Sequence, residues 1–179
     1  TRLFRGVYAT AEVVLDHATW VAAARLILPE DACLTSLSAL QHHGLDYGPV
    51  LPLRFTTRHQ TRGPRPGLIV RHRSEVIEGG VDEPLDAFEE FCREATLLEA
   101  VAVGDRMIHC GLATPDDMLA LRHSSVPAVR RAARLVRVGV ESVKETHTRM
   151  AIVLAGLPTP SCNVDVTRDD GTFVARGDM

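Results

Sequence analysis

The sequence lacks the features that mark membrane, secreted and metal-ribbon proteins. No apolar run approaches the roughly 18 residues of a bilayer-spanning helix, and no signal-peptide pattern opens the chain. None of the four cysteines forms a Cys-x-x-Cys pair, so neither a disulfide framework nor a structural zinc site is indicated. Because the chain has 179 residues and 45% hydrophobic content, it can bury a core. We therefore expect a globular cytoplasmic protein without a membrane partner.

Short motifs of common enzyme classes are missing as well. The chain has no Gly-x-Ser-x-Gly, no His-Glu-x-x-His, no phosphate-binding Gly-x-x-x-x-Gly-Lys-Ser/Thr and no Gly-x-Gly-x-x-Gly. Aromatic residues make up only 4%, which argues against a platform on which bases stack. Any nucleic-acid contact would therefore depend on charge.

Lysine is almost absent, and the charge lies in blocks. Arginine supplies 19 of the 20 basic residues, and the formal net charge is −3. Residues 54–73 contain six arginines and no acid, 75–99 contain nine acids and one base, and 122–137 are basic again. Basic blocks attract phosphate backbones, although opposite blocks could equally pair with each other. The arginines that we expect to contact nucleic acid are Arg58, Arg62, Arg65, Arg71, Arg130, Arg131 and Arg134.

Start and stop signals divide the chain into short helices and strands. Residues 1–10 read as one extended piece. Helices are predicted over 19–28, 35–43, 84–94, 96–110, from 114, 127–138 and 142–156. Strands are predicted over 53–57 and 68–72, and a hairpin over 162–175. This pattern predicts an α/β (α+β) fold with a mostly helical middle region, a small sheet and a final helix plus β-hairpin.

Two carboxylates stand out in the last segment, residues 141–179. Glu145 lies early in a predicted helix, and Asp178 follows the return strand of the hairpin. Each has a structural alternative: Glu145 fits the third helical position of a capping box on Ser142, and Asp178 could be a solvated residue near a chain end. The residues alone leave both interpretations open.

This segment resembles a known family. In order, it contains Ser142-x-x-Glu145, Gly156-Leu157-Pro158-x-Pro160, Asn163, Asp170-Gly171 and Asp178. These features resemble the start of the nuclease-like domain of bacterial proteins related to very-short-patch-repair endonucleases, in the PD-(D/E)XK group (domain of unknown function 559). Upstream segments look like a winged-helix tail and landmarks of AbiEi-type antitoxins. Those segments are Leu3 to Tyr8, His43-Gly44-Leu45 and Ala102-Val103-Gly104-Asp105.

The resemblance implies three parts: 1–10 as a remnant of a winged-helix domain, 11–138 as an AbiEi-like helical or α+β domain, and 139–179 as a partial nuclease-like domain. It also implies that Glu145 and Asp178 hold a divalent metal such as Mg²⁺, which activates water for phosphodiester hydrolysis. The family pattern places a further acid and a polar partner on a later strand. We therefore expect a truncated chain that binds no metal and does not cleave DNA.

Three functional interpretations follow from the sequence. The first is a DNA-associated protein with a metal-dependent endonuclease-like C-terminal domain, inactive in this chain. The second is a non-enzymatic, antitoxin-like or transcription-regulatory DNA-binding protein. The third is a module that binds a partner protein through the acidic helix at 84–94.

Overall fold

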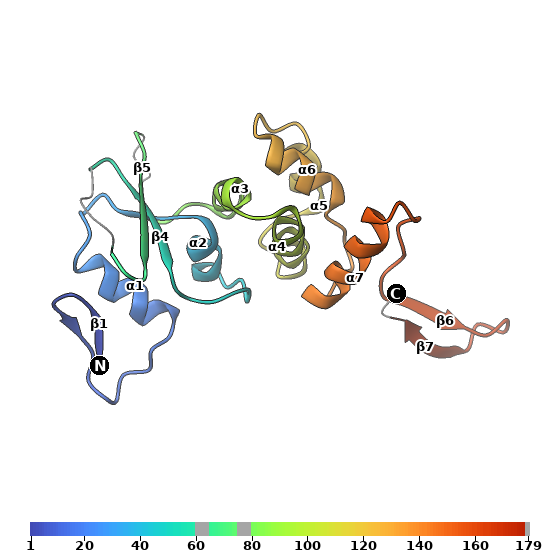
Figure 1. The fold of residues 1–179 in the computed structure, drawn as a ribbon. Helices are drawn as coiled ribbons and strands as arrows, with labels where there is room; N and C mark the ends of the chain where they lie inside the picture. The colour runs from blue at the N-terminus through green and yellow to red at the C-terminus, as the bar shows by residue number, and fades with distance from the viewer. Residues whose placement is uncertain (60–64, 75–79, 178–179) are drawn as a thin grey trace. The chain divides into compact units, whose positions relative to one another are not determined.

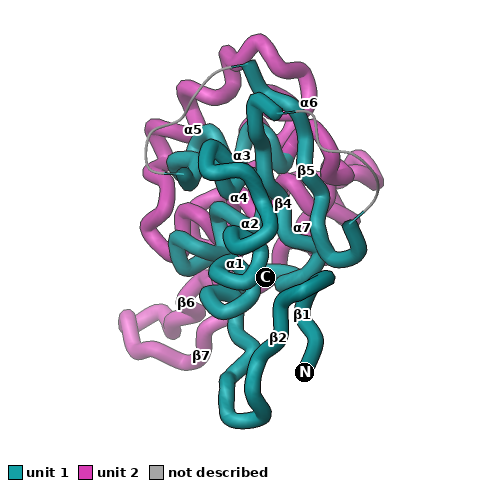
Figure 2. The backbone as a smooth tube through the Cα atoms, turned by 90° about the vertical axis from the view of Figure 1, so that its left-hand side faces the viewer, with its two compact units in different colours: residues 1–91 teal, residues 92–179 magenta. Residues whose placement is uncertain are grey.

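The computed structural model describes residues 1–59, 65–74 and 80–177 (Figure 1). The chain forms two compact units, residues 1–91 and 92–179 (Figure 2). Both contain helices and strands, which confirms the predicted mixed α+β fold. Two predicted site residues, Arg62 and Asp178, lie outside the described residues. None of the described helices is long and apolar enough to cross a membrane.

The first unit opens with a small hairpin rather than the single extended piece predicted for residues 1–10. Strands β1 (Arg2–Phe4) and β2 (Val7–Tyr8) are antiparallel. The chain reverses at Gly6, whose φ of 83° suits glycine. The ring of Phe4 then packs edge-on against Trp20 of helix α1 (His17–Arg25), with centroids 5.5 Å apart. The hairpin is therefore held onto α1 by an aromatic contact.

A three-stranded sheet forms the centre of this unit. The strands are β3 (Cys33–Leu34), β4 (Leu53–Thr57) and β5 (Leu68–His72). Strand β4 pairs antiparallel with β3 and parallel with β5, and α2 (Ser36–His42) contacts β4. Fully buried apolar side chains of β3, α2 and β4 form the core. The sequence did not predict β3, because two residues are too short to show an alternating pattern.

A buried carboxylate crosslinks this sheet. Asp82 is fully buried and accepts hydrogen bonds from both terminal nitrogens of Arg73, at 2.7 and 3.0 Å. The Thr35 hydroxyl and the Cys33 thiol also donate to it. Burial and the neighbouring Asp82 raise the pKa of Cys33 to about 12. Arg73 therefore stabilises the fold, although its sequence neighbours suggested a phosphate contact.

The second unit is mainly helical. Helix α3 (Pro84–Glu94) spans the boundary between the units. The elements that follow are α4 (Leu97–His109), α5 (Pro115–Leu121), α6 (Pro127–Leu135), α7 (Val143–Leu154), β6 (Val164–Thr167) and β7 (Phe173–Gly177). Capping boxes start α4 at Thr96 and α5 at Thr114. In each, the threonine hydroxyl accepts from the backbone N–H three residues later, and the acid at that position accepts from the threonine N–H.

Helix α4 is the central element of the second unit, because it contacts both α6 and α7. Val101, Val103 and Met107 of α4, Val129 of α6 and Met150 of α7 are fully buried. The β6–β7 hairpin, in contrast, is exposed along almost its whole length.

Candidate metal and nucleic-acid site

Glu145 lies in the first turn of α7, as the sequence predicted. The helix begins after Ser142, whose hydroxyl accepts a hydrogen bond from the Glu145 N–H at 3.2 Å. The Glu145 carboxylate does not return to the Ser142 N–H as a full capping box requires. Its Oε2 accepts instead from the Glu141 N–H at 3.1 Å. Glu145 is thus part of the helix cap through its backbone N–H and its Oε2.

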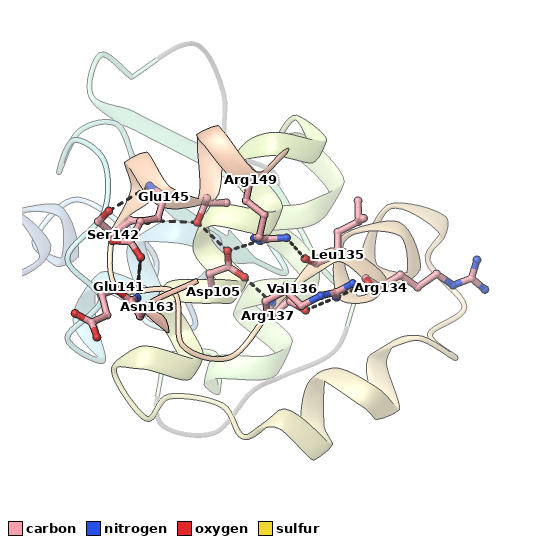
Figure 3. A network of polar contacts seen from close by, with 11 residues as sticks. Asp105, Arg134, Leu135, Val136, Arg137, Glu141, Ser142, Glu145, Arg149 and Asn163 are labelled. Carbon is pink, nitrogen blue, oxygen red and sulfur yellow. Dashed lines mark hydrogen bonds and ion pairs between the residues drawn. The ribbon is translucent and has the colours of Figure 1, made fainter. Parts of the chain in front are cut away.

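Asn163 connects this helix start to the hairpin. Its side-chain nitrogen donates to Glu145 Oε2 at 3.0 Å (Figure 3). The same nitrogen donates to the carbonyl of Gly139 at 2.5 Å. Asn163 has a φ of 54°, a left-handed conformation that asparagine tolerates better than most residues. The chain therefore turns sharply into β6 beside the Glu145 carboxylate.

The surroundings of Glu145 favour its ionised form. Burial alone would raise its pKa, but the hydrogen bonds from Ser142, Glu141 and Asn163 and the nearby His109 outweigh it, and the pKa lies below its ordinary value. The carboxylate is therefore charged at neutral pH. The Glu141 N–H and the Asn163 side chain both donate to Oε2 rather than to the other oxygen, Oε1. This oxygen is the one that could bind a cation.

The hairpin brings its return strand back to the same place. Val164, the residue after Asn163, is paired with Gly177, the last residue of β7. Arg176 of β7 also binds the Glu141 carboxylate, with 3.0 Å between Nη2 and Oε1. The described part of the chain therefore ends, after β7, next to Glu141 and Asn163, which bind Glu145. Asp178 follows Gly177 directly in sequence, but lies outside the described residues.

A buried ion pair fixes α7 in position beneath this site. Arg149 of α7 donates to Asp105 of α4 at 2.6 Å, and both side chains are at most 1% exposed. Asp105 also accepts from Thr146 at 2.7 Å and from the Arg137 N–H at 2.8 Å (Figure 3). Burial raises the pKa of Asp105, against the effect of these three donors. Asp105 was noted in the sequence as a family landmark, and its observed role is to join α4 to α7.

The same network explains where α6 ends. Helix α6 stops at Leu135, before the predicted residue 138. Val136 is extended, with a ψ of 140°, so the next N–H, that of Arg137, points to Asp105. Arg149 also donates to the carbonyl of Leu135 at 2.7 Å. A distant carboxylate and guanidinium thus supply the partners that a further helical turn would have supplied.

The described residues supply one candidate metal ligand at this place, Glu145. No group of three or more His, Cys, Asp or Glu side chains suited to a metal ion occurs in residues 1–59, 65–74 and 80–177. Hard divalent cations take at least six oxygen ligands, usually several from the protein. Among the described residues, Glu145 is therefore not joined by the further oxygen ligands that such a cation needs.

The arginines predicted in the first unit have different surroundings. The backbone N–H of Arg58 donates to Asp31 at 2.8 Å, and its side chain lies 3.7 Å from the same carboxylate. Arg65 donates to the carbonyl of Ile27 at 3.1 Å, and Arg71 is exposed on β5. Arg58 and Arg65 therefore have partners within the chain, an acid and a backbone carbonyl respectively. The charge of Arg58 is partly neutralised by Asp31.

On α6, two of the three predicted arginines face solvent. Arg130 turns back and donates to the carbonyls of Ser124 and Ser125, at 2.7 and 3.0 Å. Arg131 and Arg134 are exposed, and neither guanidinium has an ion-pair partner among the described residues. Because they are three positions apart on a helix, the two side chains are neighbours. They form the clearest candidate for a phosphate contact in the second unit.

Sequence reasoning missed two further arginines, Arg2 and Arg5. Together with Arg65 they line a cavity in the first unit. The sequence carries one sign that could have pointed to them: both lie in an N-terminal stretch that has no acidic residue before Glu12.

Comparison with known proteins assigns no family. No protein-family model, no curated protein and no solved structure gives a significant match to this chain.

Proposed function

We propose that this chain is a DNA-associated protein whose α7 helix and β6–β7 hairpin form an endonuclease-like element, with Glu145 and Asp178 as its acidic pair. The observation that carries the proposal is the contact of Asn163 with Glu145 at 3.0 Å. This contact places the start of the hairpin beside a carboxylate at the start of the helix. Pairing of Val164 with Gly177 then returns the chain to the same place, one residue before Asp178.

The chemistry of the pair follows from its charge. Glu145 is ionised because hydrogen bonds lower its pKa, and the Glu141 and Asn163 donors bind its Oε2 rather than its Oε1. A divalent cation bound there would supply Lewis-acid activation of water and screen phosphate charge. Two carboxylates are fewer protein ligands than such a site usually has. The sequence alone predicted no bound metal, but the ionised Glu145 leads us to expect weak cation binding, still without DNA cleavage by residues 1–179.

Cation binding at this place is testable by NMR with Mn²⁺. The paramagnetic ion should broaden the side-chain amide signals of Asn163 before those of other residues. Glu145→Gln and Asp178→Asn should each remove this selectivity, whereas Asp169→Asn in the exposed hairpin turn should not. Uniform broadening, or selective broadening that persists in both site variants, would show that the pair is not a cation site.

A nuclease assay tests the second part of the proposal. Incubation of the chain with plasmid DNA and Mg²⁺ should give no cleavage above background. Cleavage that EDTA stops and that Asp178→Ala abolishes would contradict the incomplete site while supporting the endonuclease-like assignment. The two conclusions can therefore fail separately.

A second candidate function is non-enzymatic DNA binding, and the exposed pair Arg131 and Arg134 favours it. Each arginine that neutralises a phosphate releases a counterion, so the affinity falls with rising salt. Arg131→Gln together with Arg134→Gln should lower the slope of log affinity against log salt by about two. Arg168→Gln, in the hairpin turn, is the matched control.

Fluorescence anisotropy with a short labelled duplex measures this slope. Equal slopes for the double variant and the control would mean that α6 does not contact DNA. Binding that is lost in the α6 variant, together with no Mn²⁺ selectivity at Asn163, would favour the non-enzymatic function over the endonuclease-like one.

A further inference from the structure

A cavity lies in the first unit between the β1–β2 hairpin and the segment that leads into β5. Its volume is about 780 Å³, within the range of about 300–1,000 Å³ that is usual for small-molecule sites. The described residues that line it are Arg2, Leu3, Phe4, Arg5, Ile27, Arg65 and Pro66. All of them belong to the first compact unit, and none belongs to the candidate site around Glu145.

Three arginines line this cavity, and its described lining contains no acid. Arg2 uses its Nε for a long hydrogen bond of 3.4 Å to the Phe4 carbonyl, and Arg65 uses one nitrogen for the Ile27 carbonyl. A guanidinium has five donors, so both retain several. Arg5 is exposed in the hairpin turn. Among the described residues none of the three forms an ion pair. Over the described residues, the lining therefore carries positive charge without an acidic partner.

The remainder of the lining is apolar and well anchored. Leu3, Ile27 and Pro66 are part of it, and Phe4 is buried against Trp20. Gly67 lies against Phe4, because a Cβ there would meet the ring at 3.4 Å. The hairpin, α1 and the start of β5 are thus packed together behind the cavity. Charge on one part and apolar surface on another suit a ligand with an anionic group and a flat apolar group.

We propose that this cavity binds a phosphomonoester of nucleotide size. The guanidiniums of Arg2, Arg5 and Arg65 would hold the phosphate, because arginine forms paired, charge-assisted hydrogen bonds with phosphate oxygens. The base would lie against Leu3, Ile27 and Pro66. The same chemistry is presented by a free mononucleotide and by the 5′-phosphate end of a DNA strand. This proposal does not depend on the function proposed above, since it concerns a different unit and different residues.

Calorimetric titration of the full chain tests the proposal with three ligands: one that has only the phosphate, one that has phosphate and nucleoside, and one that has only the nucleoside. Inorganic phosphate should bind weakly, deoxyadenosine monophosphate more tightly, and deoxyadenosine, which lacks the phosphate, not measurably. A short single strand with a 5′-phosphate, compared with the same strand ending in a 5′-hydroxyl, distinguishes the two sources. Preference for the free nucleotide indicates a small-molecule site, and preference for the phosphorylated strand indicates an end-binding site.

Variants locate the binding. Arg5→Gln and Arg2→Gln should each lower the affinity for deoxyadenosine monophosphate by about tenfold to a hundredfold. This is the loss expected for one charge-assisted hydrogen bond. The side chain of Arg5 lies in an exposed turn and has no hydrogen-bond partner among the described residues, so this variant should fold normally. Arg168→Gln is the matched control and should bind as the unmodified chain does. Circular dichroism checks the folding of each variant.

Several results would overturn the proposal. Absence of binding by both the nucleotide and the 5′-phosphorylated strand would do so, as would equal affinity for deoxyadenosine. Affinity that is unchanged in both Arg2→Gln and Arg5→Gln would place the ligand elsewhere. Binding of succinate as tightly as the nucleotide would show that the cavity accepts carboxylates and not specifically phosphomonoesters.

Discussion

Removal of the Asp105 carboxylate should destabilise the second unit strongly. In Asp105→Leu, Arg149 stays 1% exposed and loses its only carboxylate partner among the described residues, and Thr146 and the Arg137 N–H lose their acceptor. Breaking a buried pair by removing one partner costs about 3–5 kcal/mol. Since domains are stable by about 5–15 kcal/mol, the loss is a large part of the whole.

The physical cause can be separated from simple loss of packing by a double-mutant cycle. Arg149→Met removes the charge that Asp105→Leu leaves unpaired, so the double variant should recover roughly half of the lost stability. Urea unfolding followed by far-UV circular dichroism measures the four free energies of unfolding. Asp169→Asn, in the exposed hairpin turn, is the control and should change stability by less than about 0.5 kcal/mol.

Two outcomes would refute this reasoning. A loss below about 1 kcal/mol for Asp105→Leu would mean that water reaches Arg149 and solvates it in place of Asp105. Strictly additive losses in the double variant would mean that the two side chains do not interact energetically. In either case Asp105 would not be what holds α7, and therefore Glu145, against α4.

Three further results are expected. A thiol reagent should modify the exposed Cys110 first and leave the buried Cys33 unmodified until urea is added, because burial raises the pKa of Cys33 to about 12; mass spectrometry of digested protein identifies the order. Thr114→Ala should lower the free energy of unfolding by about 1 kcal/mol, since it removes the cap of α5, as urea denaturation would show. The difference in free energy of unfolding between the unmodified chain and Glu145→Gln should shrink as the pH falls through the lowered pKa of Glu145. The reason is that protonation makes the carboxylate a weaker acceptor for Asn163. A difference that stays constant down to pH 3 would contradict this linkage.

Local signals in the sequence predicted the helices of the second unit well. Thr96 and Thr114 are followed three residues later by an acid, and each forms the reciprocal hydrogen bonds of a capping box. Such a cap depends on a few adjacent residues, so the sequence carries the whole signal. The first ten residues were predicted less well, because the packing of Phe4 on Trp20 that stabilises the hairpin joins residues sixteen positions apart.

The candidate site shows the same division. The sequence identified Glu145, Asn163 and the hairpin, and it placed Glu145 in a helix cap. It did not show that Asn163 would bind the Glu145 carboxylate, since that contact spans eighteen positions and depends on a left-handed turn. The sequence showed the charge blocks, but not which arginines would have partners in the folded chain. Arg73 binds Asp82, and Arg130 donates to the loop before α6. Arg131 and Arg134 are exposed.

The sequence by itself determined the mixed α+β class and the position of most helices, and it singled out Glu145 and Asp178 as candidates, because periodicity, caps and turns act between near neighbours. Only the tertiary structure decided which charged groups are buried in pairs, where α6 ends, and that Arg2, Arg5 and Arg65 line one cavity. These features join residues that are tens of positions apart. Their energies depend on burial and on the direction of side chains, and neither is written in the local order of residues.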